Sequence, residues 1–566
     1  MRHCLSSFHR FFLPAFLLTV ASVFYLAVAC PAQELPQHTA LQAKSQLISY
    51  VGSKVCATCH AEIYRKYLET TMAKASGAAN RGIIYGEFTH KPSKVHYRIY
   101  EENGRAWLSF DRAKDRPLEG KRELLYFIGS GHRGRTYLFS ENGFVFEAPI
   151  NWYGQGNTWD MAPGYKETRE IPLSLPALTS CLRCHTSSFQ LPAEGTDNKY
   201  VLPLFAEDGV ACERCHGPGK AHSEKSGPIV NPAKLPAERR DEVCMQCHLE
   251  GDVAIEQNGK HLYGYIPGDE LASYVHYLLL KKSGASNPRA VSHFEALVQS
   301  KCRKKTGDSM TCTTCHDPHD SPSAELRVSY YRSRCLGCHG ESFGNRHHAK
   351  KRDCTSCHMP RMPSRDVAHT QVTDHRILSN PKSSAVNEVS QTKTQLVRFP
   401  PGAGDASSRD LVLGWLALAE TGRDFALLEE EKLLAKTAAE YPDDAAILSA
   451  YAYEELRNKK TVHATELFQK ALKSDPLNVD AAVNLGVIEV QGGYAGKALS
   501  LWKSAFERAP WRPASGLNIA QVLCNLGRTE EAKSYVKLVL QYNPDHSQAN
   551  SLLQQLQTKA KRCSSP

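Results

Sequence analysis

The stretch TCTTCHDPHD, residues 311–320, holds two cysteines and two histidines within ten residues. Its core, Cys-x-x-Cys-His, occurs seven times in the chain. Chance placement of 19 cysteines and 24 histidines would give far less than one copy. The seven copies, numbered here from first to seventh motif, begin at Cys56, Cys181, Cys212, Cys244, Cys312, Cys335 and Cys354.

Cys-x-x-Cys-His is the attachment sequence of c-type haem. The two thiols form thioether bonds to the porphyrin edge, and the adjacent histidine then meets the iron from one face. Zinc coordination does not need a histidine directly after the second cysteine, and disulfides do not need the histidine at all. The motifs therefore predict seven covalent haem c groups, each with its iron. The predicted thioether cysteines are Cys56, Cys59, Cys181, Cys184, Cys212, Cys215, Cys244, Cys247, Cys312, Cys315, Cys335, Cys338, Cys354 and Cys357, and the predicted proximal ligands are His60, His185, His216, His248, His316, His339 and His358.

The ligand on the far side of each iron decides what that haem can do. Histidine gives a closed electron-transfer haem, methionine raises the potential, and an empty position can bind a substrate. Twelve histidines between residues 50 and 376 lie outside the motifs, so we expect mostly bis-histidine haems. The candidate distal ligands are His222, His319, His348, His369, His375, His90 and His293.

His319 lies three residues after the proximal His316, with Pro318 between them. Because this tether is too short to reach the far face of the same iron, we expect His319 to bind a neighbouring haem. His222, six residues after His216, has the same geometry. At both positions the alternative is an ordinary surface or hydrogen-bonded histidine.

The first 30 residues read as an export signal. Arg2 and Arg10 make the first residues positively charged, residues 11–29 are apolar, and Ala27-Val28-Ala29 matches a signal-peptidase cleavage site. An uncleaved membrane anchor is the alternative reading. Cys30 follows the cleavage site directly, as in a bacterial lipoprotein. We therefore expect the mature chain in the periplasm or on the outer surface, with lipidation or membrane attachment at the N-terminus left open.

The central part, residues 48–376, is expected to be a multihaem domain. Its first two motifs are separated by 120 residues without cysteine, and Asn103-Gly104 and Asn142-Gly143 lie there between alternating apolar runs. Such pairs are typical of β-hairpins, so residues 85–150 are predicted to be a small antiparallel β insertion. The other six motifs crowd into residues 181–358, where short helices and loops around porphyrins are expected.

The C-terminal part, residues 407–560, has a different pattern, after a polar predicted linker at residues 377–406. Four prolines recur every 34 residues, and three alanines keep the same period. This period predicts tetratricopeptide repeats, a solenoid of helix pairs that offers a groove to a protein partner. The fold class is therefore mainly α, with a β insertion. The recurring residues are Pro442, Pro476, Pro510, Pro544, Ala464, Ala498 and Ala532.

Several of these stretches together resemble exported multihaem c-type cytochromes fused to C-terminal tetratricopeptide repeats. They are YVGSKVCATCH, GVACERCHGPGKAH, EVCMQCHLE, SKCRKKTGDSMTCTTCHDPH, KRDCTSCHMP and AHTQVTDHRI. The haem part is distantly similar to the electron-shuttle cytochromes of hydroxylamine oxidation. The resemblance implies electron transfer in the periplasm or at the cell surface. It also supports distal roles for His222, His319, His348, His369 and His375.

Three functions follow from the sequence. The first is an electron-transfer protein that exchanges electrons with redox partner proteins and docks a partner on its repeats. The second is a reductase or oxidase of a small nitrogen or sulfur compound at one open haem, near the unpaired Cys302 and His293. The chain lacks the Cys-x-x-Cys-Lys motif of ammonia-forming nitrite reductases. The third is a scaffold that recruits a respiratory complex.

The formal net charge of +10 does not indicate nucleic-acid binding. Each bis-histidine ferric haem c brings about one negative charge through its ionised propionates, and seven such groups cancel most of the excess.

Overall fold

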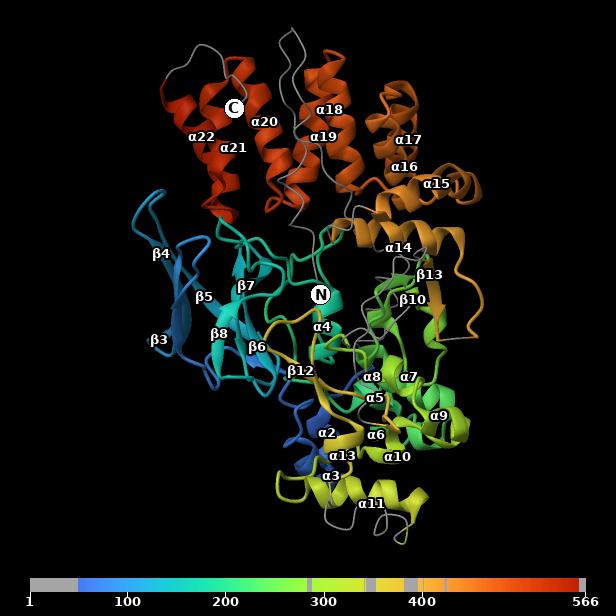
Figure 1. The fold of residues 1–566 in the computed structure, drawn as a ribbon. Helices are drawn as coiled ribbons and strands as arrows, with labels where there is room; N and C mark the ends of the chain where they lie inside the picture. Colours follow the sequence, from blue (N-terminus) through green and yellow to red (C-terminus); the bar gives the residue numbers. More distant parts are fainter. Residues whose placement is uncertain are drawn as a thin grey trace.

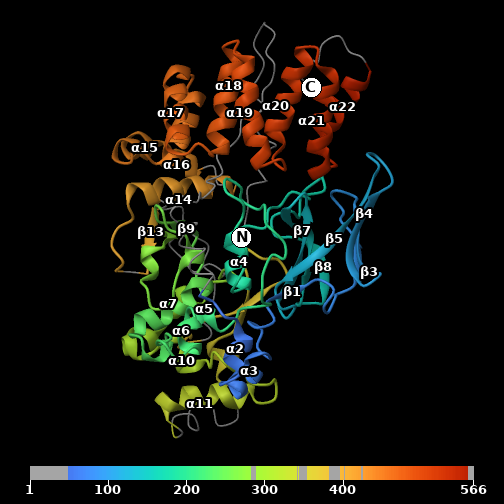
Figure 2. The ribbon, with the colours of Figure 1, turned by 180° about the vertical axis from the view of Figure 1, so that it is seen from behind.

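The computed structural model describes residues 49–281, 288–340, 342, 353–380, 395–400, 402–421 and 425–558. An array of paired helices lies across one end of the molecule, above an antiparallel sheet on one side and the motif-bearing segments on the other (Figure 1). The view from behind shows the same three regions (Figure 2). The predicted export signal, Cys30 and His348 lie outside the described residues. Within those residues no helix is long and apolar enough to cross a membrane.

The predicted β insertion is an eight-stranded antiparallel sheet. Its strands follow one another from β2 to β8, and β1 pairs with β5. Asn103 and Asn142 have φ values of 55° and 53° and form the two predicted hairpin turns. The sheet extends beyond residues 85–150 because the short strands β1 and β8 flank it. The strands are β1 (Ser76–Ala78), β2 (Gly86–Thr89), β3 (His96–Glu102), β4 (Arg105–Arg112), β5 (Leu118–Ile128), β6 (Gly134–Glu141), β7 (Phe144–Tyr153) and β8 (Thr158–Met161).

The motifs lie on short helices joined by loops, as predicted. Six of these helices, α3, α6, α9, α10, α11 and α13, have no buried residue. Their packing therefore does not come from a side-chain core. The helices of this region are α2 (Ser53–Ala57), α3 (Ala61–Tyr67), α4 (Thr179–His185), α5 (Glu213–His216), α6 (Lys220–Ser223), α7 (Ala237–His248), α8 (His293–Leu297), α9 (Lys301–Thr306), α10 (Cys312–Cys315), α11 (Arg327–His339) and α13 (Thr355–His358).

Part of the predicted linker belongs to a small sheet. Strand β13 (Gln395–Phe399) pairs antiparallel with β10 (Val275–Lys281), which also pairs with β9 (Val253–Glu256). The structure thus differs from the predicted linker at its C-terminal end. A five-residue strand in polar surroundings gives a weak local signal, and its partner lies far away in the sequence. Strands β11 (Arg361–Pro363) and β12 (Gln371–Thr373) form a separate two-stranded sheet.

The C-terminal part is an array of antiparallel helix pairs. Ala464, Ala498 and Ala532, the alanines with the 34-residue period, are completely buried where paired helices cross. Trp502 packs over Gly486, where a Cβ would lie 2.3 Å from the indole nitrogen, so the glycine permits this contact. The helices are α14 (Ser408–Glu420), α15 (Phe425–Glu440), α16 (Ala445–Arg457), α17 (Thr461–Ser474), α18 (Val479–Gln491), α19 (Ala495–Arg508), α20 (Pro513–Asn525), α21 (Thr529–Tyr542) and α22 (Ser547–Gln557).

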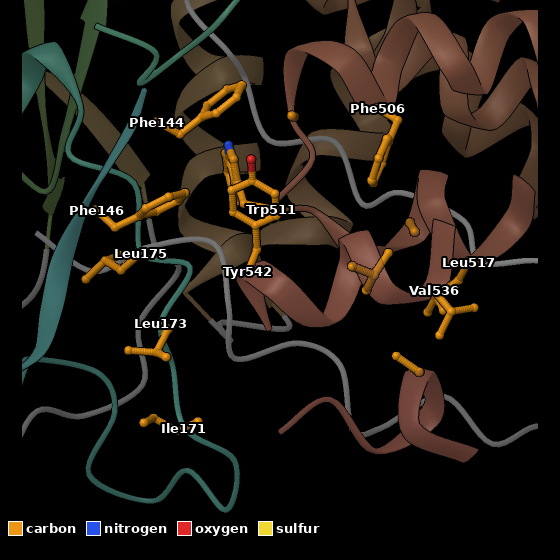
Figure 3. Packing of buried hydrophobic residues seen from close by; sticks show 14 of the residues in the cluster. Phe144, Phe146, Ile171, Leu173, Leu175, Phe506, Trp511, Leu517, Val536 and Tyr542 are labelled. Carbon is orange, nitrogen blue, oxygen red and sulfur yellow. The ribbon is translucent and has the colours of Figure 1, made fainter. Parts of the chain in front are cut away.

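The helical array shares a hydrophobic core with the β sheet (Figure 3). Phe146 of β7 lies edge-on to Trp511 and Tyr542, with ring centroids 6.4 and 6.0 Å apart. Beside this core, buried Arg112 donates to the carboxylate of Asp545 at 2.9 Å. At the other end of the array, His276 of β10 is hydrogen-bonded to Asp410 of α14 at 2.8 Å. Contacts near both ends of the array therefore fix it to the rest of the chain.

Candidate haem-binding site

The motifs fold so that their chemically active groups share one face of a helical turn. In the first, fifth and seventh motifs the histidine N–H donates to the carbonyl of the first cysteine, at 2.9–3.0 Å. Residues four apart on a helix lie on the same side. The first thiol and the imidazole therefore point the same way, as attachment of one porphyrin requires.

Cysteines of different motifs lie next to one another. Burial and the neighbouring Cys212 raise the pKa of Cys56 to about 11. A hydrogen bond from the Cys247 thiol lowers the pKa of Cys184 to about 6. The fourth and fifth motifs meet in the same way through Cys244 and Cys312, and the sixth and seventh through Cys335 and Cys354. Neighbouring motifs thus contact one another through their cysteines, and the fourth motif contacts both the second and the fifth.

Three proximal histidines face a second histidine ring at a distance suited to one iron. The ring centroids of His60 and His222 are 6.5 Å apart, those of His216 and His319 are 5.9 Å apart, and those of His316 and His375 are 6.3 Å apart. An imidazole nitrogen binds a first-row metal at about 2.0–2.1 Å, so two imidazoles on one iron have centres roughly 6 Å apart. All three pairs have this spacing.

Hydrogen bonds fix the orientation of several of these rings. The Nδ1 of His216 donates to the carbonyl of Val230 at 2.8 Å, and that of His375 to Thr373 at 2.9 Å. The Nδ1 of His358 lies 2.6 Å from the carbonyl oxygen of Leu378. A carbonyl only accepts, so Nδ1 carries the proton and Nε2 keeps its lone pair for a metal.

His293 lies between two other histidine rings, those of His248 and His375. Its ring centroid is 5.2 Å from that of His248, with the planes at 81°, and 5.0 Å from that of His375. Burial lowers the pKa of His248 to about 4, which keeps the imidazole in the neutral form that binds iron. His185 is buried too, with its pKa lowered to about 4. In the described part of the chain, no histidine ring is paired with that of His185.

Two predicted distal ligands are engaged elsewhere. His90 uses both ring nitrogens inside the sheet region, with Ser93 Oγ at 2.8 Å and the Lys166 carbonyl at 2.9 Å. The Nε2 of His369 is hydrogen-bonded to Asp160 of β8 at 2.8 Å. These contacts engage both ring nitrogens of His90 but only the Nε2 of His369, and the distal roles of both histidines stay predictions. Both His369 and His375 follow the seventh motif, so their position in the sequence did not show which of them would face another histidine ring.

Buried carboxylates, which the sequence analysis missed, connect the motifs. Glu213, inside the third motif, accepts from the backbone N–H groups of Val51 and Gly52 at the start of the first motif's helix. Asp241 of α7 accepts from the N–H of Cys312 at 2.9 Å. Residues inside or beside Cys-x-x-Cys-His vary freely in the pattern, so no local signal marks these roles.

The surroundings of the motifs fit a porphyrin better than zinc. No group of three or more His, Cys, Asp or Glu side chains in the described residues is arranged to hold a metal by itself. Large apolar side chains beside the first and sixth motifs are exposed, among them Ile63, Leu68 and Leu326. Apolar surface of this kind beside an attachment motif is what the face of a porphyrin covers. The residues present therefore fit covalent haem c.

Family models match three segments of the chain. "Cytochrome c554 and c-prime" matches residues 158–217, "Doubled CXXCH motif" matches residues 305–343, and "Tetratricopeptide repeat" matches residues 491–556. No curated protein matches the sequence.

Solved structures resemble the chain only weakly. The outer cell wall cytochrome OcwA is 15% identical, with 81% of this chain and 100% of that chain covered and a TM-score of 0.37. The first tetratricopeptide repeat domain of Spaghetti (RPAP3), bound to an HSP90 peptide, is 19% identical over 20% of this chain and 94% of that chain, with a TM-score of 0.20. The tetratricopeptide repeat protein TTC0263 of Thermus thermophilus is 22% identical over 27% of this chain and 84% of that chain, with a TM-score of 0.24. These scores carry no argument on their own. The motifs, the paired imidazoles and the family matches identify a multihaem c-type cytochrome part joined to tetratricopeptide repeats.

Proposed function

We propose that this protein is an exported electron carrier with seven covalent haem c groups, most of them bis-histidine. The observation that carries the proposal is the pairing of His216 with His319. A histidine that follows the fifth motif faces the proximal histidine of the third motif. Such an exchange of ligands holds two porphyrins in fixed contact, which is what transfer between haems needs.

The contacts between motifs form a connected network. The first motif meets the third through Cys56 and Cys212, and the third meets the fifth through His216 and His319. The fifth meets the seventh through His375. The remaining links join the fourth motif to the second and fifth, and the sixth to the seventh. An electron entering at any haem thus has a path of neighbouring haems to every other.

The predicted location and partners complete the proposal. The predicted export signal and the attachment motifs support a location outside the cytoplasm, in the periplasm or on the outer surface. The donor and the acceptor are redox proteins, and the repeats hold a protein partner. Because the array is fixed to the sheet region, a docked partner would be held at a constant distance from the haems.

A second candidate function is catalysis on a small nitrogen or sulfur compound. It is favoured by His185, whose ring has no histidine facing it among the described residues. An iron with an open sixth position can bind a substrate. The electron-carrier function does not need such a position.

One experiment tests both functions. The full-length protein is purified, its haem content is quantified by the pyridine haemochrome method, and its air-oxidised form is examined by low-temperature EPR. Seven haems per chain with low-spin signals only would support the carrier. Fewer covalent haems would overturn the count. A high-spin signal that shifts on adding nitrite, hydroxylamine or sulfite would favour the enzyme instead.

A further inference from the structure

The carboxylate of Glu213 lies where three segments of the haem region meet. Glu213 is the first variable residue of the third motif, and it is only 3% exposed. One of its oxygens accepts from the backbone N–H of Gly219 at 2.7 Å, and the other accepts from that of Gly52 at 2.8 Å. The N–H of Val51 lies 3.0 and 3.1 Å from the two oxygens. One buried carboxylate therefore binds backbone on two sides.

The first of these two segments leads into the first motif. Gly52 precedes α2, and its φ of 81° is a conformation that favours glycine. The N–H of Ser53 donates to Glu207 at 3.1 Å, and its Oγ accepts from the N–H of Cys212 at 3.2 Å. The start of α2 is thus fixed to the third motif, and the proximal His60 follows the end of this helix.

The second segment leads into α6, which carries the distal candidate His222. Gly219 is the residue before this helix, and His222 is its third residue. The N–H of Lys220 also donates to the carbonyl of Ser49, at 3.1 Å. A Cβ on Gly219 would lie 3.0 Å from an oxygen of Glu213, so the glycine leaves room for the carboxylate. Helix α6 is therefore held against the same carboxylate as α2.

The two segments that Glu213 binds bring one pair of histidine rings together. The ring centroids of His60 and His222 are 6.5 Å apart, and the ring planes are within 17° of parallel. Helices of five and four residues, such as α2 and α6, are not stable by themselves. The separation of the two rings therefore depends on contacts outside these helices, and Glu213 contacts the backbone directly before each of them.

We infer that Glu213 is the positioning residue of the first haem, and that it holds His60 and His222 at the separation at which both bind one iron. The inference rests on the proposed haem content and ligands. Glu213 acts through the backbone of two short helices and not by contact with the iron. Because it lies inside the third motif, one stretch of five residues both attaches the third haem and sets the ligands of the first.

Glu213→Gln tests this role with almost no change in shape. A glutamine side chain has one acceptor oxygen and one NH₂ donor in place of two acceptor oxygens. It can accept on the Gly219 side or on the Gly52 side but not on both, and its NH₂ group then faces a backbone N–H. We expect one of the two helices to move, so that the first haem loses its sixth ligand in most molecules.

The experiment compares the full-length holoprotein with its variants by haem content and by low-temperature EPR of the oxidised form. His222→Ala is the reference, because loss of the ring that faces His60 identifies the signal of the first haem. Glu62→Gln is the matched control, since it is the same substitution on α3, two residues after His60, at a side chain that is 75% exposed. Gly219→Ala is a second test, because its Cβ crowds the carboxylate and leaves Glu213 in place. If Glu213→Gln loses haem, the result for Gly219→Ala decides.

We expect Glu213→Gln and Gly219→Ala to keep all seven haems and to convert most of the low-spin signal of the first haem to a high-spin signal. The other signals should keep their native form, and Glu62→Gln should change nothing. Added imidazole should restore the low-spin signal, because it takes the place of the displaced His222 ring. A general loss of stability would not give a change that is confined to one haem and reversed by imidazole.

A first-haem signal that is unchanged in both variants would overturn the inference. An equal loss of every haem signal in both variants would overturn it too, because Glu213 would then stabilise the whole region and not one ligand pair. If His222→Ala leaves every signal low-spin, the proposed ligand pair is wrong and the inference falls with it. Fewer than seven haems in the native protein would instead contradict the proposed haem content.

Discussion

The imidazole rings of His216 and His319 lie 5.9 Å apart, centre to centre, and within 9° of parallel. His319 is tied by three residues to His316, the predicted proximal ligand of another haem. His316 in turn faces His375, which follows the seventh motif. In the proposed haem arrangement, these ligand exchanges link the third motif to the fifth and the fifth to the seventh, so the three motifs would have to assemble together.

Replacing His319 tests this exchange. His319→Ala should convert one low-spin ferric haem to a high-spin haem, because it removes the sixth ligand facing His216. His319→Met should keep that haem low-spin and raise its potential. Low-temperature EPR and a redox titration measure the two effects.

His369→Ala is the control for this prediction. His369 follows the same motif as His375, but its Nε2 is hydrogen-bonded to Asp160. Its removal should leave every EPR signal in place. If His319→Ala also leaves all signals low-spin, His319 is not an iron ligand and the pairing of the third and fifth motifs is only a packing contact.

The buried ion pair between Arg112 and Asp545 should be a main attachment of the helical array. Asp545 also accepts from the backbone N–H of Ile171 at 3.2 Å. Asp545→Ala leaves the buried Arg112 cation without its carboxylate, a change that costs about 3–5 kcal/mol. Urea unfolding followed by tryptophan fluorescence measures the loss.

An exposed ion pair in the same array is the control for Asp545→Ala. Arg528 and Glu531 lie 2.7 Å apart on the surface, and Arg528→Ala should not change the urea midpoint measurably. Equal effects of Asp545→Ala and Arg528→Ala would mean that the array is not fixed through Arg112.

The sequence made the attachment motifs and the repeats predictable because both are local. The spacing in Cys-x-x-Cys-His needs five residues, and the 34-residue period is visible in Ala464, Ala498 and Ala532 alone. The asparagine-glycine turns likewise located the hairpins of the sheet. These features depend only on residues close together in the chain, so the sequence alone is enough to predict them.

The rest depends on contacts between distant segments. His375 and His369 are six residues apart, yet only His375 faces a proximal histidine, because Asp160 of the sheet binds His369. Strand β13 exists because β10 is beside it. A single sequence carries no record of such pairs.

Removing the repeats at residue 400 should damage the rest of the protein. The deletion takes away Trp511 and Tyr542 and exposes Phe144 and Phe146 to water. We expect the truncated chain to be less soluble and to unfold at a lower temperature. Trp511→Ala in the full chain should cost about 3–5 kcal/mol for the same reason.

Thermal unfolding and haem content measure this effect, and Val462→Ala, at a side chain that is 77% exposed on α17, is the control. A soluble truncated chain with full haem content and an unchanged midpoint would contradict the shared core. In that case truncation could separate the carrier from the scaffold function. With a shared core, point variants on the repeats are needed instead.

Stability of the helical array should fall as the pH rises. Burial, with Glu454 and Glu431 nearby, raises the pKa of Glu430 to about 8. An unfolded glutamate has a pKa of about 4.3. Between these two values the folded state binds a proton that the unfolded state releases, so the contribution of Glu430 is complete below the lower value and is lost as the pH rises to the upper one.

Glu430→Gln mimics the protonated side chain and tests the sign. It should leave the unfolding midpoint unchanged near about pH 4 and raise it near about pH 9, where the native carboxylate is charged and buried. Glu466→Gln, on the exposed face of α17, should change neither midpoint. A Glu430→Gln protein with the native pH profile would show that Glu430 is solvated when the array is folded, and the pH dependence would then come from another group.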